Sequence, residues 1–212
     1  MKRKDTERGD ALLNFLKSDA IVSVGKEYAE IGIDSVLESG VLKDIPFVNT
    51  VIGAFNAGSS IRDHFFSLKL LRFLKELASI PESERIALGE RLNDDDKFAG
   101  KAGSAILEII DRLESEKKPE LAAQCFAVFA RQEVTYDDLR RLLVALERLP
   151  SFDLAKVRDF SNTSIERALT MDESLLLAFV NSGLGKNNGG FDGGAIMPTK
   201  LCKLFVKIGL AP

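Results

Sequence analysis

Apolar residues recur three and four positions apart along most of the chain, and this spacing favours helices over strands. The clearest case runs from Thr135 to Leu149, because Thr135 is a suitable N-cap and Pro150 stops the element. One apolar stripe follows this segment, formed by Leu139, Leu142, Leu143, Leu146 and Leu149. Alternating polar and apolar residues, typical of strands, are nearly absent. The sequence therefore predicts an all-α protein.

Further helices are expected before this segment. They cover residues 11–16, 20–37, 61–78 and 81–92, a segment after the acidic run 94–96, and a segment that begins at Pro119. The helix over 61–78 has only a narrow polar stripe, so most of its sides must be covered. It is either central in the bundle or partly covered by a partner. We expect the helical bundle to span residues 1–150.

Residues 151–212 differ in character and are predicted to form a separate C-terminal subdomain. A short helix over 172–182 precedes a loop rich in glycine and asparagine over 183–194, and a final helix starts near Thr199. This order resembles the end of a winged-helix domain, in which a β-hairpin separates two helices. The sequence favours a helical hairpin with a disordered loop over this winged-helix interpretation. The expected architecture is thus a multi-helix bundle with a small C-terminal helical or winged-helix-like appendage.

The segment from Ile45 to Ile61 contains no charged residue, and its small residues at 53, 54, 57 and 58 form two pairs four positions apart. This spacing lets the backbone of another helix approach closely. As a helix the segment would be about 26 Å long, just short of the roughly 30 Å hydrocarbon thickness of a bilayer. Its several polar residues make it less hydrophobic than a typical membrane span. We interpret it as a buried core helix, with reversible membrane contact and a true span as alternatives.

Candidate contact residues follow from these patterns. A candidate interaction or membrane segment consists of Val48, Ile52, Gly53, Ala57, Gly58, Phe65, Phe66 and Phe73. Its contact with a membrane would require a conformational change that exposes both helices. A candidate basic contact face on the final helix consists of Lys200, Lys203 and Lys207, for which a merely solvated helix face is the alternative.

One resemblance rests on the first half of the chain. It involves Ile45-Pro46-Phe47-Val48, followed by Gly53, Gly58, Ser60-Ile61-Arg62-Asp63, Phe66 and Lys69-Leu70-Leu71-Arg72-Phe73-Leu74. This general pattern resembles a group of uncharacterised small bacterial all-helical proteins. The resemblance implies a bacterial or phage-related origin, and it transfers no activity and no catalytic or binding residues.

The search for catalytic, metal or nucleotide motifs finds none above chance. His64 lies beside Asp63, and adjacent helix positions point about 100° apart, so the two do not form an acid–base pair. Cys125 and Cys202 lie in apolar helical patterns, which indicates reduced core thiols. One histidine and two distant cysteines do not supply a zinc site. No cofactor and no small-molecule substrate is expected.

These patterns favour a non-enzymatic bacterial interaction or regulatory protein that acts through protein–protein contacts or self-association. A membrane-associated or membrane-perturbing effector that exposes the helices over 45–77 is the first alternative. A DNA-binding regulator acting through the C-terminal region is the second, and the lack of Lys and Arg in the helix over 172–182 counts against it. We expect a cytoplasmic location, or one peripheral to the membrane, because charged residues follow the basic start of the chain.

Overall fold

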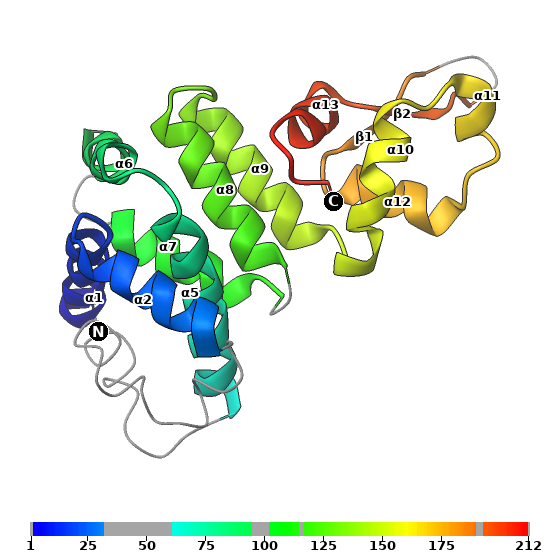
Figure 1. Cartoon of the computed structure of the whole chain (residues 1–212). Coiled ribbons are helices and arrows are strands. Elements are labelled where there is room, and N and C mark those ends of the chain that lie inside the picture. Colours follow the sequence, from blue (N-terminus) through cyan, green and yellow to red (C-terminus); the bar gives the residue numbers. More distant parts are fainter. Residues whose placement is uncertain (1, 32–60, 95–101, 115–116, 190–192, 212) are drawn as a thin grey trace. The chain divides into compact units, whose positions relative to one another are not determined.

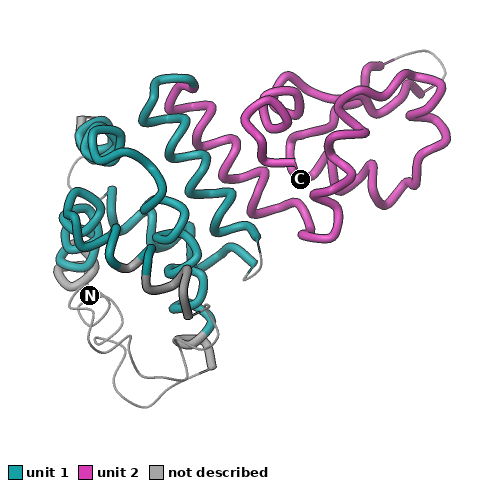
Figure 2. Tube along the Cα trace, in the orientation of Figure 1, with its two compact units in different colours: residues 1–133 teal, residues 134–212 magenta. Residues whose placement is uncertain are grey.

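The computed structural model describes residues 2–31, 61–94, 102–114, 117–189 and 193–211, and the chain divides into two compact units (Figures 1 and 2). The first unit is Met1–Glu133 and the second is Val134–Pro212. Helices dominate the described residues, in which one small two-stranded sheet is present, so the all-α prediction is confirmed. The division lies before residue 136 and not at residue 150. The helix over 136–148 joins the second unit because it packs against the last helix of the chain.

The first unit is a helical bundle. Its helices are α1 Lys2–Leu16, α2 Ala20–Ile31, α5 Ile61–Ala78, α6 Glu82–Asp94, α7 Ala102–Arg112 and α8 Lys118–Ala130. Apart from the core helix predicted over 45–61, each helix predicted for this part is present, although α1 starts at Lys2 and not at the predicted residue 11. Residues 32–37 of the second predicted helix lie outside the described residues. The same holds for the uncharged segment up to residue 60.

Helix α5 is central in this bundle and packs against α2, α7 and α8. Its fully buried side chains are Leu70, Leu71, Phe73, Leu74 and Leu77. Burying a side chain of this size contributes roughly 1.5–3 kcal/mol to stability. The ring of Phe73 meets that of Phe126 on α8 edge-on, with the ring centroids 5.7 Å apart. Of the two interpretations of the narrow polar stripe, the structure therefore selects the central position.

Helices α1 and α7 touch through their backbones at two glycines. A Cβ atom added to Gly9 would lie 2.5 Å from the backbone nitrogen of Ser104, and one added to Gly103 would overlap the carbonyl of Gly9. Because glycine has no Cβ, its presence on both helices permits this close approach. The small residues at 53–58, for which the sequence predicts such a contact, lie outside the described residues, and no sequence pattern indicates the pair of Gly9 and Gly103.

A buried arginine ties helix ends together in the same unit. The guanidinium of Arg85 donates hydrogen bonds to the carbonyl of Leu16, at 3.0 Å, and to that of Ile80, at 2.7 Å. Leu16 ends α1 and Ile80 follows α5, so both carbonyls lie where a helix leaves acceptors unpaired. The positive charge of Arg85 also suits the negative end of a helix dipole.

The second unit begins with a long helix and continues with short elements. They are α9 Tyr136–Arg148, the 3-10 helix η2 Ser151–Lys156, α10 Val157–Ser161, α11 Ile165–Ala168, α12 Glu173–Asn181, the strands β1 Gly185–Asn187 and β2 Ile196–Pro198, and α13 Lys200–Lys207. The predicted N-cap of α9 is confirmed. Thr135 and Asp138 form a reciprocal capping box, in which the amide of Asp138 donates to Thr135 Oγ1 at 3.1 Å.

Two glycines end α12 and α13 in the same way. Gly183 has φ 77° and Gly209 has φ 82°, and each follows the last turn of its helix. The next amide, that of Leu184 or Leu210, then donates back to a buried phenylalanine carbonyl, at 2.8 and 3.1 Å respectively. These are the bonds of the Schellman motif, which favours glycine because the left-handed conformation strains other residues.

An antiparallel hairpin lies between α12 and α13, and Lys186 pairs with Met197 at its centre. The winged-helix interpretation predicts such a β-hairpin at this place, whereas the favoured interpretation, two helices joined by a disordered loop, does not. None of the described helices combines the length and the apolar character needed to cross a membrane.

Candidate functional site

The predicted interaction segment divides into three groups in the structure. Its members Val48, Ile52, Gly53, Ala57 and Gly58 lie outside the described residues. Two of its phenylalanines, Phe66 and Phe73, are buried in the first unit, where they serve as core. Phe65 is 47% exposed and is the one member of the segment that the described structure places at a surface.

The predicted basic face is present on α13, where Lys200, Lys203 and Lys207 are all exposed. The structure nevertheless distributes them between two grooves of the second unit. Lys203 and Lys207 border a groove of about 620 Å³ together with Met197 of the hairpin. Lys200 borders a larger groove of about 720 Å³ on another side of α13. We call this larger cavity the α9–α13 groove.

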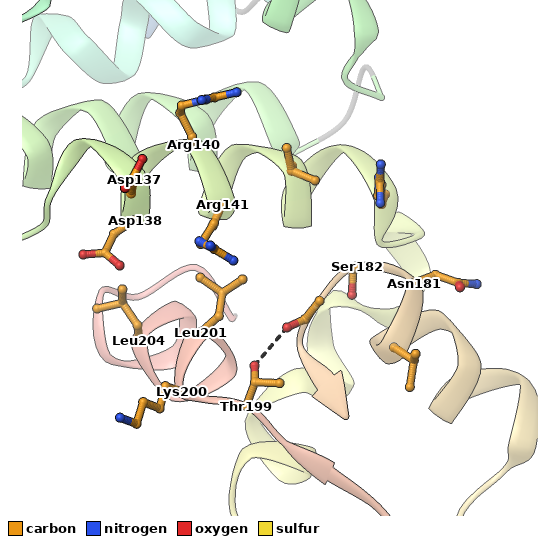
Figure 3. A pocket seen from close by; sticks show the side chains of 14 residues that line it. Asp137, Asp138, Arg140, Arg141, Asn181, Ser182, Thr199, Lys200, Leu201 and Leu204 are labelled. Carbon is orange, nitrogen blue, oxygen red and sulfur yellow. Dashed lines mark hydrogen bonds between the residues drawn. The ribbon is translucent and has the colours of Figure 1, made fainter. Parts of the chain in front are cut away.

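The α9–α13 groove lies wholly within the second unit (Figure 3). One wall is the exposed face of α9, and the other consists of the start of α13 and the end of α12. Figure 3 shows Arg141 on α9 pointing across the groove toward Leu201 on α13. Residues 141, 144 and 148 of α9 follow helical spacing, so they form one row along this wall.

Thr199 fixes the junction between α12 and α13. Its Oγ1 accepts a hydrogen bond from the amide of Cys202 at 3.1 Å, which caps α13. The same hydroxyl donates to the carbonyl of Gly183 at 2.9 Å, just beyond the end of α12. The amide of Thr199 also donates to the carbonyl of Leu184 at 2.8 Å. These bonds fix the start of α13 against the end of α12, the two parts of this wall.

Cations exceed anions along the groove. Arg140, Arg141, Arg148 and Lys200 line it, together with only two carboxylates, Asp137 and Asp138. Asp138 is already engaged, because its Oδ2 accepts from the amide of Thr135 at 3.1 Å and from the hydroxyl at 2.7 Å. Arg140 lies with its guanidinium 6.0 Å from the ring centroid of Tyr136. Within the described residues, Arg141, Arg148 and Lys200 form no ion pair.

Apolar side chains lie between these cations. Val144 of α9 and Val180 of α12 line the groove and are both exposed, and Leu201 and Leu204 of α13 line it as well. Leu177 lies one helical turn before Val180 on α12 and is 52% exposed. The groove therefore offers a mixed surface, apolar in part and positively charged at its sides.

The polar groups of the groove do not form a nucleophilic centre. Its two hydroxyls both donate to backbone carbonyls, Ser182 to that of Phe179 at 3.0 Å and Thr199 to that of Gly183 at 2.9 Å. Cys202 is buried, and this burial raises the pKa of its thiol to about 12, so the thiolate needed for attack is scarce at neutral pH.

Comparison with known proteins gives no relative to this chain. No protein-family model, curated protein or solved structure matches it. The groove therefore has to be interpreted from its own residues.

From the sequence alone the arginines of α9 are expected only on a solvated helix face, so they are not among the candidate residues. The structure brings Arg141 and Arg148 to the same groove as Lys200, which lies more than fifty positions later in the chain. The α9 wall of the groove does have a local sequence pattern. Arg141, Val144 and Arg148 form the exposed row of a helix whose leucines are all buried. The partner wall has no such signal, because it forms only when α13 folds back on α9.

Proposed function

We propose that this protein is a non-enzymatic interaction module that binds a partner protein through its second unit. The surface of α12 is the observation that supports this function most. This fully described helix contains Leu175, Leu176, Leu177, Ala178 and Val180, yet Phe179 is its one buried side chain. Leu177 and Val180 are exposed, and Leu175, Leu176 and Ala178 are half-buried. Single exposed apolar residues are ordinary on protein surfaces, whereas two adjacent ones on one short helix indicate a contact surface.

The two most exposed apolar residues of α12 share one face. Leu177 and Val180 are three positions apart, so they lie next to each other on the helix surface. Val180 also lines the α9–α13 groove, so this face continues into the groove. A partner that covers Leu177 and Val180 removes apolar area from water, which favours association by roughly 25 cal/mol per Å² before the costs of binding.

The experiment uses the full chain as bait and then a purified partner. Proteins captured from the source cells are identified, and the interaction of each purified candidate is measured by titration calorimetry. We expect a negative heat-capacity change, because apolar surface is buried. Leu177→Asp should weaken binding at least tenfold, while thermal unfolding of the chain stays unchanged.

Phe65→Asp is the matched control, because it places the same charge at an exposed apolar residue of the first unit. We expect it to leave the affinity within twofold. The proposal fails when no purified candidate distinguishes Leu177→Asp from the parent chain. If a partner binds Leu177→Asp but not Phe65→Asp, the binding surface lies in the candidate interaction segment predicted from the sequence.

DNA binding receives less support than protein binding. In a winged-helix arrangement, the helix before the hairpin would enter the major groove, and here that helix is α12. It carries Glu173 in its first turn, its N-cap is Asp172, and it contains no Lys or Arg. These charges repel phosphates, whereas the leucines of α12 suit a protein surface.

A further inference from the structure

We propose that the α9–α13 groove binds an acidic amphipathic helix of the partner protein. This inference rests on the proposed function, because it names the chemistry of the segment that the interaction module recognises. It goes beyond that function by assigning the partner's charge and secondary structure to particular residues of the groove.

The charge of the occupant follows from which groups of the groove are free. Arg141, Arg148 and Lys200 have exposed side chains, and no ion pair with a described residue neutralises them. Of the two carboxylates, Asp138 is held by Thr135 in the capping box. An approaching Asp or Glu side chain therefore meets unpaired donors, and a charged hydrogen bond to an arginine is among the stronger contacts that a carboxylate makes.

The apolar part of the groove excludes a purely ionic ligand as its best occupant. Val144 lies between Arg141 and Arg148 in the α9 row, and Val180 and Leu204 face the same cavity. A free anion would pair with the cations and leave these side chains in water. A peptide that carries leucine-like residues between its acids satisfies both kinds of surface at once.

The walls of the groove favour a helix over an extended strand. They consist of α9, the start of α13 and the end of α12, and neither strand of the hairpin lines the cavity. Because the hairpin lies outside the lining of the cavity, the groove presents no strand edge to a peptide. The α9 row from Asp137 to Arg148 extends for about 16 Å, which matches about eleven residues of a partner helix.

The test is a peptide selection on the intact chain. A phage library of random 15-residue peptides is selected in parallel on the parent chain and on the Arg141→Glu/Arg148→Glu chain. Peptides enriched on the parent are then synthesised with a fluorescein label and measured by anisotropy. We expect enriched sequences with Asp or Glu and leucine-like residues at helical spacing. Arg141→Glu should weaken their binding at least tenfold, and added salt should weaken binding to the parent.

Arg167→Glu is the matched control, because it reverses another exposed arginine of the same unit that lies on α11, outside the groove. It should leave peptide affinity within twofold. A charge swap provides the stricter check. An enriched peptide with one acid replaced by lysine should lose binding to the parent and regain it with Arg141→Glu. Circular dichroism confirms that each variant keeps its helix content.

The outcomes separate this inference from the proposed function. Enriched peptides that are neutral or basic, or that bind Arg141→Glu as well as the parent, overturn the acidic-helix inference. If such peptides bind the parent chain but not Leu177→Asp, the proposed protein-binding function holds although the acidic-helix inference does not. The inference is also overturned if no peptide is enriched. The same holds if duplex DNA is the one ligand whose binding is abolished by Arg141→Glu. A cellular partner that still depends on Leu177 would then keep the proposed function.

Discussion

The two units of this chain differ in their balance of charged residues and in how many large apolar side chains they expose. Residues 1–133 contain 19 Lys and Arg against 23 Asp and Glu, whereas residues 134–212 contain 10 against 9, so the second unit is the more basic. Among the described residues, the large exposed apolar side chains of the second unit are Val144, Phe152, Ile165, Leu169, Leu177 and Val180. Phe65 is the one such residue in the described part of the first unit.

We infer from this difference that contact with other molecules is more favourable at the second unit than at the first. In the first unit most of the described apolar residues of the central helix α5, Phe65 excepted, are buried against neighbouring helices and are not available to a partner. In the second unit the helices after α9 are short, and α12 leaves Leu177 and Val180 exposed. We therefore interpret the first unit as a scaffold and the second as the contact surface. The variants below test this difference between a buried core and an exposed surface.

The largest effect is expected at Phe73, which is fully buried in the first unit. Phe73→Ala removes the ring that meets Phe126 and leaves a cavity, so it should lower the free energy of unfolding by about 4 kcal/mol. Phe152 of the second unit is 77% exposed, so Phe152→Ala should change it by less than about 0.5 kcal/mol. Urea unfolding followed by circular dichroism measures both, and equal effects would remove the contrast between core and surface.

The next effect is expected at the contact of α1 with α7. Gly103→Ala adds a Cβ that collides with the backbone of Gly9, so it should destabilise the first unit by about 3 kcal/mol. Hydrogen exchange should report lost protection in residues 1–133 and unchanged protection in residues 134–212.

Gly89→Ala is the matched control in helix α6. Its Cβ would meet only the side-chain end of Lys17, at 2.5 Å from Cε, and a lysine side chain can move aside. Because alanine favours a helix over glycine, we expect an increase in stability of up to about 1 kcal/mol. A loss of stability in Gly89→Ala as large as that in Gly103→Ala would contradict the special role of the glycine pair.

A smaller effect is expected at Thr199 in the second unit. Thr199→Val removes the cap of α13 and the bond to the carbonyl of Gly183, which should cost about 1–2 kcal/mol. Hydrogen exchange should rise in residues 200–207, and the labelled acidic peptide should bind more weakly because one wall of the groove shifts.

Ser164→Ala is the control for a cap outside the groove. Ser164 accepts a bond from the amide of Arg167 at 3.3 Å at the start of the short helix α11. Loss of this hydrogen bond should increase amide hydrogen exchange in α11 but leave the affinity for the peptide unchanged. Equal weakening of peptide binding by both variants would show that the groove does not depend on Thr199 in particular.

The smallest effect concerns the two buried thiols, one in each unit. Burial raises the pKa of Cys125, and it raises the pKa of Cys202 to about 12. An unfolded thiol loses its proton above about pH 8.5, while the folded thiol keeps it, so stability is full below that pH and falls as pH rises. By pH 9.5 each thiol should account for a loss of about 1 kcal/mol.

Urea unfolding at pH 7.5 and pH 9.5 measures this loss. Cys125→Ala and Cys202→Ala should each show a smaller difference between the two pH values than the parent chain. An unchanged difference in Cys202→Ala would mean that its thiol ionises as readily in the folded second unit as in the unfolded chain.

The sequence alone was informative about local structure. The limits of α5 agree with the predicted 61–78, and the capping of α9 by Thr135 was visible because it depends on residues only three positions apart. The start of α1 was missed because its first turns are charged and carry no apolar stripe. The hairpin before α13 was left open, since three-residue strands are too short to show alternation.

Local patterns determined where most helices form, because helical spacing and caps act between residues that are close in sequence. The tertiary structure alone decided which faces meet. Gly9 and Gly103 are nearly a hundred residues apart, and only the packing of α1 on α7 makes both glycines necessary. Arg141 and Lys200 likewise share a groove only because α13 packs against α9. Such contacts depend on the geometry of the whole fold, which no window of sequence contains.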